Sequence, residues 1–291
     1  MKLDGRRIST NVDDRRGRSA GSIGKAGGLG LGGLVIVGII TLLMGGNPLD
    51  LLSMLGSVDT GSGQMTESGY VPSAEEEELA LFSKRILAGT EDVWSAIFKE
   101  YGRTYEPPKL VLFNGAVQSG CGGATSSSGP FYCSADQCVY LDLSFFSSMK
   151  QQLGADGDFA YAYVIAHEVG HHVQYLLGTL GQAHKQMQKV GGTESNRISV
   201  RLELQADYYA GIWAHHDNEM FGSLEEGDIE EGLAVAARIG DDYLQKKARG
   251  YTVPDSFNHG TSAQRSKWLK KGISSGKLEQ GDTFSPAYGS L

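Results

Sequence analysis

Basic residues are scarce over most of this sequence, which argues against binding to nucleic acids. Beyond residue 25 the chain holds 19 lysines and arginines against 31 aspartates and glutamates, whereas residues 1–25 hold seven basic and three acidic residues. An acidic surface repels the phosphates of nucleic acids. We therefore expect no nucleic-acid binding by the body of the chain.

Cysteine is also rare, with three residues in 291: Cys121, Cys133 and Cys138. Three thiols have no obvious fourth partner for a cysteine-ligated zinc. In an extracytoplasmic domain, one disulfide and one remaining thiol are expected. The spacing does not decide which two cysteines pair.

One long stretch is both uncharged and apolar. Residues 28–44 read GLGLGGLVIVGIITLLM. About 17–19 residues at 1.5 Å each approach the ~30 Å of a membrane's hydrocarbon core. Because basic residues precede it, the positive-inside rule predicts a single-pass anchor with a cytoplasmic N-terminus. A cleaved signal peptide and a buried core helix are the alternatives. The signal peptide is disfavoured because the basic region is long and no A-x-A site follows the apolar run, and the glycines and the charged flank disfavour the core helix.

The sequence then divides into four parts. Residues 1–27 are predicted to be a disordered, basic, cytoplasmic tail, 28–46 the transmembrane helix, 47–72 a flexible linker and 73–291 one folded domain. Ser73 caps the first helix of that domain, and a second helix is predicted after Thr90.

The folded domain is predicted to be α+β, with helices dominating and a small sheet before them. Two β-type runs, 109–113 and 139–143, are expected to form the sheet. Helices are predicted at 158–177, 182–190, 194–215 and 224–247, and 265–271 is expected to start a last one.

The helix at 158–177 contains the pattern H-E-x-x-H, as His167-Glu168-Val169-Gly170-His171. Residues four apart lie one above the other on a helix face, so the two imidazoles can bind one Zn²⁺. Glu168 lies beside the metal as a general base. Gly170 leaves room for an approaching backbone. His172 and His184 are expected to be solvated or supporting residues.

A catalytic zinc needs a third protein ligand, and Glu203 is the best choice. Glu203 and Asp207 are four residues apart on an otherwise apolar helix, where burying two carboxylates is costly unless they are paired or metal-bound. Glu203 is predicted to ligate the metal and Asp207 to accept the free N–H of a ligand histidine. Surface salt bridges to nearby arginines are the alternative. His215 and His216 are weaker choices, about three turns away.

The chain resembles the neutral zinc metallopeptidases of bacteria, a membrane-anchored group. The resemblance runs nearly end to end and rests on GPFYC at 129–133, VYLDLSFF at 139–146, AHEVGHHVQ at 166–174, ELQADYYAG at 203–211 and VPDSFNHGTSAQR at 253–265. It is also similar to gluzincin peptidases, which implies a zincin-like domain with His167, His171 and Glu203 as Zn²⁺ ligands. It further implies an inner-membrane protein with a periplasmic catalytic domain.

Three further expectations follow from that resemblance. His259 is expected to stabilise the oxyanion, and Arg265 to pair with Asp207 or another buried acid. Cys121 and Cys133 are the preferred disulfide, although a bridge between Cys133 and the spare Cys138 stays open. The strand at 139–143 is expected either to be an edge that holds an extended substrate or to be a plain core strand.

The predicted function is a membrane-anchored metallopeptidase that hydrolyses peptide or protein substrates, with Glu168 as general base. One alternative is a non-catalytic, zinc-stabilised interaction module outside the cytoplasm. Another is a different metal-assisted hydrolase, such as an amidase on cell-wall peptides. Because a purely structural zinc site closes its fourth position with another ligand, the presence of Glu168 favours catalysis.

Overall fold

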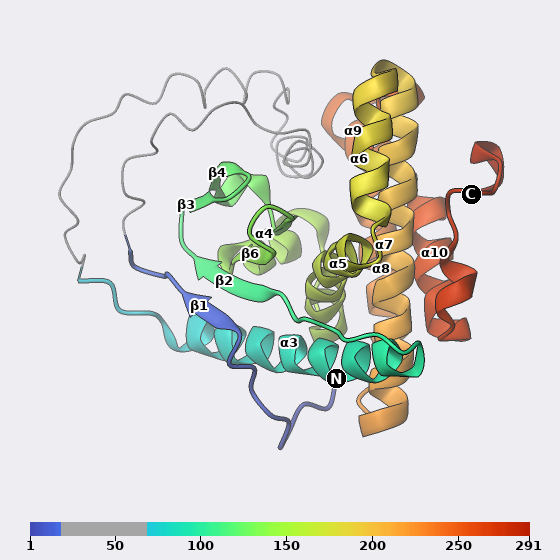
Figure 1. The fold of residues 1–291 in the computed structure, drawn as a ribbon. Helices are drawn as coiled ribbons and strands as arrows, with labels where there is room; N and C mark the ends of the chain where they lie inside the picture. Colours follow the sequence, from blue (N-terminus) through green and yellow to red (C-terminus); the bar gives the residue numbers. More distant parts are fainter. Residues whose placement is uncertain (19–68) are drawn as a thin grey trace.

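A computed structural model describes residues 1–18 and 69–291 of the chain (Figure 1). The predicted membrane helix, 28–46, and most of the predicted linker, 47–72, lie outside these ranges. Within them, no helix combines the length and the apolar character needed to cross a bilayer. The anchor and the side of the membrane therefore stay predictions.

The main sheet has four strands in the order β1-β2-β6-β5. β1 (Val12–Asp14) and β6 (Cys138–Asp142) both run parallel to β2 (Lys109–Phe113), and β5 (Phe131–Cys133) is antiparallel to β6. β3 (Ala116–Ser119) and β4 (Gly122–Thr125) form a separate hairpin. β6 is thus an inner strand, so of the two alternatives for 139–143 the plain core strand is confirmed and the substrate-holding edge is wrong. The edge strand on this side of the sheet is β5, because the GPFYC segment turns back and pairs with β6.

Alternation along the strands gives the sheet two buried faces. Leu110, Leu112, Val139 and Leu141 point into the main core, shared with the helices. Their neighbours Val111, Phe113 and Tyr140 point to the other face, where the β3–β4 hairpin covers a smaller core. The short runs KLVLF and VYLDL are therefore apolar throughout because both of their faces are covered.

A disulfide between Cys121 and Cys133 joins the hairpin to β5. This is the predicted pairing, and Cys138 is the buried free thiol. The bridge closes the smaller core at the strand that borders the functional site.

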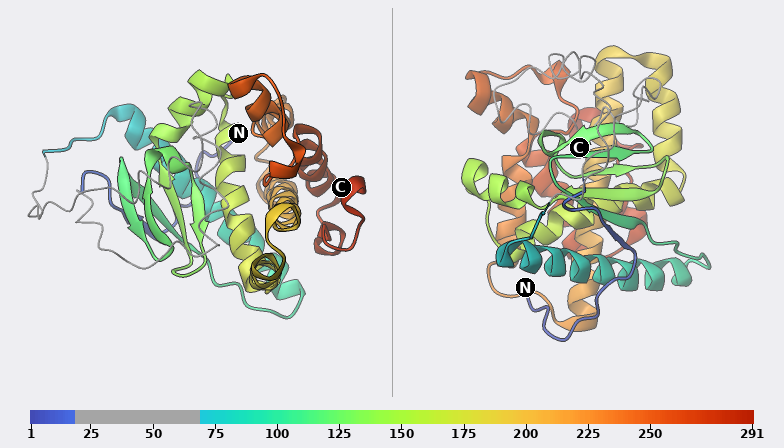
Figure 2. Two further views of the ribbon diagram at one scale, coloured as in Figure 1. Left: turned by 90° about the horizontal axis from the view of Figure 1, so that it is seen from above. Right: turned by 90° about the vertical axis from the view of Figure 1, so that its left-hand side faces the viewer.

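The helices form layers beside the sheet (Figure 2, left). α3 (Ala74–Glu100) and α5 (Asp158–Leu176) pack against the sheet, α7 (Gly192–Phe221) packs against α5, and α10 (Ser262–Ser275) packs against α7. The others are α4 (Ser144–Leu153), α6 (Thr179–Val190), α8 (Asp228–Arg238) and α9 (Asp241–Arg249). The helix-dominated α+β class is confirmed.

Two predicted helix boundaries are wrong. No new helix begins after Thr90, because Thr90 is buried inside α3 and its hydroxyl donates to the Leu87 carbonyl at 2.7 Å. The single helix predicted at 224–247 is two, because Gly240 lies where an added Cβ would be 2.3 Å from the Ser262 backbone nitrogen. The chain turns there and starts α9 at Asp241.

The N-terminal residues are ordered, so the disordered tail predicted at 1–27 is wrong for residues 1–18. β1 lies in the main sheet, and Arg6 forms an ion pair with Asp217 of α7 at 2.7 Å. Arg7 pairs with Glu91 of α3, also at 2.7 Å. The sequence pattern suggested a tail because basic residues dominate it, but Arg6 and Arg7 pair with carboxylates that are distant in the sequence.

Candidate metal centre

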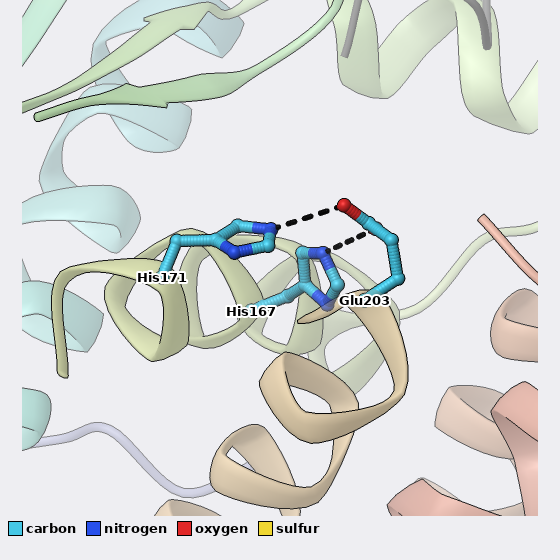
Figure 3. A group of neighbouring side chains, drawn as sticks. All are labelled: His167, His171 and Glu203. Atoms are coloured by element: carbon cyan, nitrogen blue, oxygen red, sulfur yellow. Dashed lines mark ion pairs between the residues drawn. The ribbon is translucent and has the colours of Figure 1, made fainter. Parts of the chain in front are cut away.

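The candidate metal centre lies where α5 crosses α7. Gly170 of α5 faces Ala206 of α7 so closely that an added Cβ would lie 2.9 Å from the Ala206 carbonyl oxygen. Only glycine permits this approach of two helix backbones. His167, about one turn before Gly170, and His171, the next residue after it, project from α5 toward Glu203 of α7 (Figure 3).

The three side chains converge with the spacing of metal ligands. His167 Nε2 lies 3.3 Å from one Glu203 carboxylate oxygen, and His171 Nε2 lies 3.4 Å from the other. Donors about 2.0–2.2 Å from a tetrahedral Zn²⁺ lie roughly 3.3–3.6 Å from one another. The three groups are buried, and their donor atoms lie within 4.8 Å of one another.

The unpaired atoms of this cluster also fit a cation. Among the described residues, His171 Nε2 and Glu203 Oε1 are buried without a hydrogen-bond partner, although they face each other. Leaving a buried donor or acceptor unsatisfied is costly. A divalent cation shared by the two imidazoles and the carboxylate satisfies both atoms, so the residues present fit Zn²⁺.

Opposite charges within the cluster shift the pKa values of His167 and Glu203. Burial lowers the pKa of His167, but the carboxylates of Asp207 and Glu203 outweigh it and raise that pKa to about 10. Burial raises the pKa of Glu203, but the imidazoles of His171 and His167 hold it well below its usual range. Glu203 is therefore ionised, as a metal ligand must be.

Asp207 supports His167 from the other side of the ring. Its Oδ1 lies 2.8 Å from His167 Nδ1, and Arg265 binds both of its oxygens at 2.9 Å. The Tyr163 hydroxyl also donates to Asp207 Oδ1, at 2.6 Å. Burial raises the pKa of Asp207, but the Arg265 guanidinium and the His167 imidazole together outweigh this effect. The net pKa is lowered, so the carboxylate stays charged. An ionised Asp207 keeps the proton on Nδ1 and leaves Nε2 as the ligand atom.

His171 is oriented by its own helix. Its Nδ1 lies 2.9 Å from the side-chain oxygen of Gln174, whose amide group donates to the Leu202 carbonyl of α7 at 2.7 Å. His172 points away into the core, where it contacts Tyr132 and the Glu106 carbonyl. Burial lowers the pKa of His172 to about 4, so it is a neutral core residue rather than a solvated one.

Glu168 lies at the edge of the cluster with one oxygen free. Burial raises its pKa, although the two neighbouring imidazoles and the backbone N–H of Tyr132 counteract this. Its Oε2 has no partner among the described residues. Both Glu168 and His167 line a pocket together with Ser128, Pro130 and Phe145.

His259 lines the same pocket from the loop before α10. Its Nδ1 lies 3.2 Å from Asp241, and the backbone N–H groups of 258–260 donate to the other oxygen of that carboxylate. Burial lowers the pKa of His259, but Asp241 outweighs this and raises it. Its Nε2 is buried without a partner in the described part of the chain.

Several residues of this site were not identified from the sequence. They are Tyr163, Gln174 and Asp241, and the pocket-lining segment at 128–130. Only the position of Gln174, three residues after His171, gave a sequence signal. His215 and His216, the weaker choices for a third ligand, lie elsewhere and group with Glu219 instead.

Comparison with known proteins gives this architecture a class. Residues 1–284 match the family described as "Putative neutral zinc metallopeptidase", and the chain belongs to that family. It is 49% identical over 288 residues to YpfJ of Escherichia coli K12, covering 98% of this chain and 99% of that one. It is 42% identical over 213 residues to Mb2605 of Mycobacterium bovis, covering 70% and 71%. No solved structure matches the chain.

Proposed function

We propose that this chain is a zinc-dependent metallopeptidase that hydrolyses peptide bonds. One observation carries the proposal: the side chains of His167, His171 and Glu203 converge as metal ligands. Two of them, His167 and Glu203, line a pocket together with Glu168, whose Oε2 has no partner among the described residues. A structural zinc site does not need an unpaired acid beside it. Membership of the family supports the same conclusion.

His167, His171 and Glu203 hold the cation. When bound there, Zn²⁺ supplies Lewis-acid chemistry, which lowers the pKa of water and polarises a carbonyl. Glu168 takes a proton from the attacking water and delivers it to the nitrogen of the leaving amine. Its surroundings suit both steps, because burial raises its pKa while the two neighbouring imidazoles counteract this rise.

His259 stabilises the oxyanion that forms on the attacked carbonyl. Asp241 holds its Nδ1, so a protonated His259 directs its Nε2–H toward the pocket. A fixed donor at the developing charge contributes about 2.7–4 kcal/mol to such reactions. Asp241 is a positioning residue that also raises the pKa of His259.

The edge strand β5 supports binding of an extended substrate. Its outer edge is unpaired in the described structure, and Tyr132 within it is hydrogen-bonded to Glu168 through the backbone. A peptide that adds to β5 as a further strand would therefore pass directly beside the general base.

Turnover of a generic peptide by the full chain, compared with Glu168→Gln, tests the proposal. We expect the variant to retain its zinc and to lose about 10²–10⁴-fold in kcat/KM. His171→Ala should lose both zinc and activity. Equal inactivity of wild type and Glu168→Gln, both with zinc at the site, would favour the non-catalytic module.

We also propose that the chain is attached to a membrane and acts outside the cytoplasm. The apolar run at 28–46 supports the attachment. The Cys121–Cys133 disulfide supports an oxidising compartment, because such bonds are rare in the cytosol. Separation of membrane and soluble fractions, with thiol titration of the isolated protein, tests both points.

A further inference from the structure

We propose that His215, His216 and Glu219 bind a second divalent cation, Zn²⁺, at the C-terminal end of α7. This site is independent of the proposed peptidase activity. His215 Nε2 lies 3.4 Å from one oxygen of Glu219, and His216 Nδ1 lies 3.0 Å from the other. The three donor atoms lie within 4.8 Å of one another, as at the catalytic cluster.

Backbone carbonyls set both imidazoles in a ligand tautomer. His215 Nδ1 lies 2.8 Å from the Ile273 carbonyl, and His216 Nε2 lies 2.8 Å from the Gly276 carbonyl. A carbonyl oxygen only accepts, so each of these nitrogens carries the proton. His215 Nε2 and His216 Nδ1 are then the ring nitrogens that face the Glu219 carboxylate, where a shared cation would bind all three groups. Metal-ligating histidines are commonly held in this way.

The surroundings of the site supply no competing cation. Gly276 ends α10 with a positive φ of 60°, and an added Cβ there would lie 2.3 Å from the His215 ring. The end of α7 carries the partial negative charge of a helix C-terminus. Within the described ranges, no lysine or arginine pairs with Glu219. All three side chains are partly exposed, so water can complete the coordination.

Zinc stoichiometry of the full chain tests the site after equilibration with micromolar Zn²⁺. We expect two equivalents for wild type, one for Glu219→Gln and one for Glu203→Gln, and none for the double variant. Glu219→Gln keeps both histidines and their carbonyl contacts, and it should leave peptidase activity unchanged. Glu226→Gln, which removes an exposed carboxylate seven residues away, is the matched control and should retain two.

The outcomes separate this site from the catalytic one. One equivalent in wild type that Glu203→Gln abolishes would overturn the second site and leave the proposed function intact. Two equivalents that Glu219→Gln does not reduce would also overturn it, as would binding to Glu203→Gln that requires millimolar Zn²⁺. Titration of Glu203→Gln with Zn²⁺ should give one site, weakened by Glu219→Gln more than the about 10–100-fold typical of supporting residues.

A second observation carries a separate inference, about membrane topology. We infer that residues 1–18 and 69–291 lie on the same side of the membrane. β1 is hydrogen-bonded into the main sheet, and Arg6 and Asp217 form an ion pair in which the aspartate is 1% exposed and the arginine 10%. A single crossing between residues 18 and 69 would place these partners on opposite sides. The inferred topology differs from the predicted single-pass one, because both flanks share a compartment.

Thiol labelling in intact bacterial cells tests this inference. Thr10→Cys and Ser285→Cys each place a thiol at an exposed position, while Cys138 stays buried and serves as background. With a membrane-impermeant maleimide, we expect both sites to be labelled or both to be protected until the cells are lysed. Labelling of one site and protection of the other would overturn the inference.

Discussion

Replacement of Gly170 by alanine is the sharpest test of the metal centre, because this glycine sets the distance between the ligand helices. An added Cβ would lie 2.9 Å from the Ala206 carbonyl oxygen and 3.1 Å from its Cα. Both are backbone atoms, so no side chain can rotate away. α5 and α7 must separate by a few tenths of an ångström, which is comparable with the roughly 0.2 Å tolerance of metal–ligand distances.

The cost has two parts. Overpacking of this kind lowers the free energy of unfolding by about 1–3 kcal/mol, or roughly 2–4 °C in Tm per kcal/mol for a domain of this size. The separation also moves Glu203 away from His167 and His171, so zinc affinity should fall. Calorimetry and zinc titration of the same preparation measure the two effects.

Gly181→Ala is the matched control. Gly181 is also helical, in α6, but nothing lies within 4 Å of an added Cβ. Alanine there should raise stability by up to about 1 kcal/mol, since it favours the helix. If Gly170→Ala behaves like this control, with wild-type zinc affinity and activity, the close approach of α5 and α7 does not set the ligand geometry.

Three other variants test separate parts of the structure. Asp241 raises the pKa of His259, so His259 loses its proton only when the pH rises through this raised pKa. Asp241→Asn should therefore move the basic limb of the kcat/KM profile to lower pH. An unmoved limb would exclude His259 as the donor. Arg6→Ala leaves Asp217 buried without its partner and should lower stability by about 3–5 kcal/mol in urea unfolding, and a cost below ~1 kcal/mol would refute docking of the N-terminal residues. Cys121→Ser opens a disulfide of sequence separation 12 and should cost about 3 kcal/mol under oxidising conditions but nothing after reduction of both proteins, as thermal unfolding can show.

Much of the fold could be predicted from the sequence, because the spacing of apolar residues within one segment identifies a helix or a strand. The apolar spacing of α5 and the short β-type runs of β2 and β6 identify the elements without reference to the rest of the chain. Thr90 and Gly240 show where such reasoning fails. A capping residue inside α3 and a break between α8 and α9 depend on what packs against them.

The same limit applies to the site. The i,i+4 spacing of His167 and His171 places two imidazoles on one face of any helix, so it could be read directly from the sequence. Asp241 could not be found in this way. It lies 18 residues before His259, and the turn that brings them together exists only because Gly240 packs against α10.

By itself, the sequence determined which side chains can share a helix face, that two carboxylates stand on an apolar helix, and that one stretch is long and uncharged, because these depend on spacing along the chain. Only the tertiary structure decided that Glu203 meets the two histidines, that β5 rather than β6 is the edge, and that the basic N-terminal residues pack against α3 and α7. Those outcomes depend on contacts between residues far apart in the chain. Such contacts are chosen by the packing of the whole domain, not by any local preference.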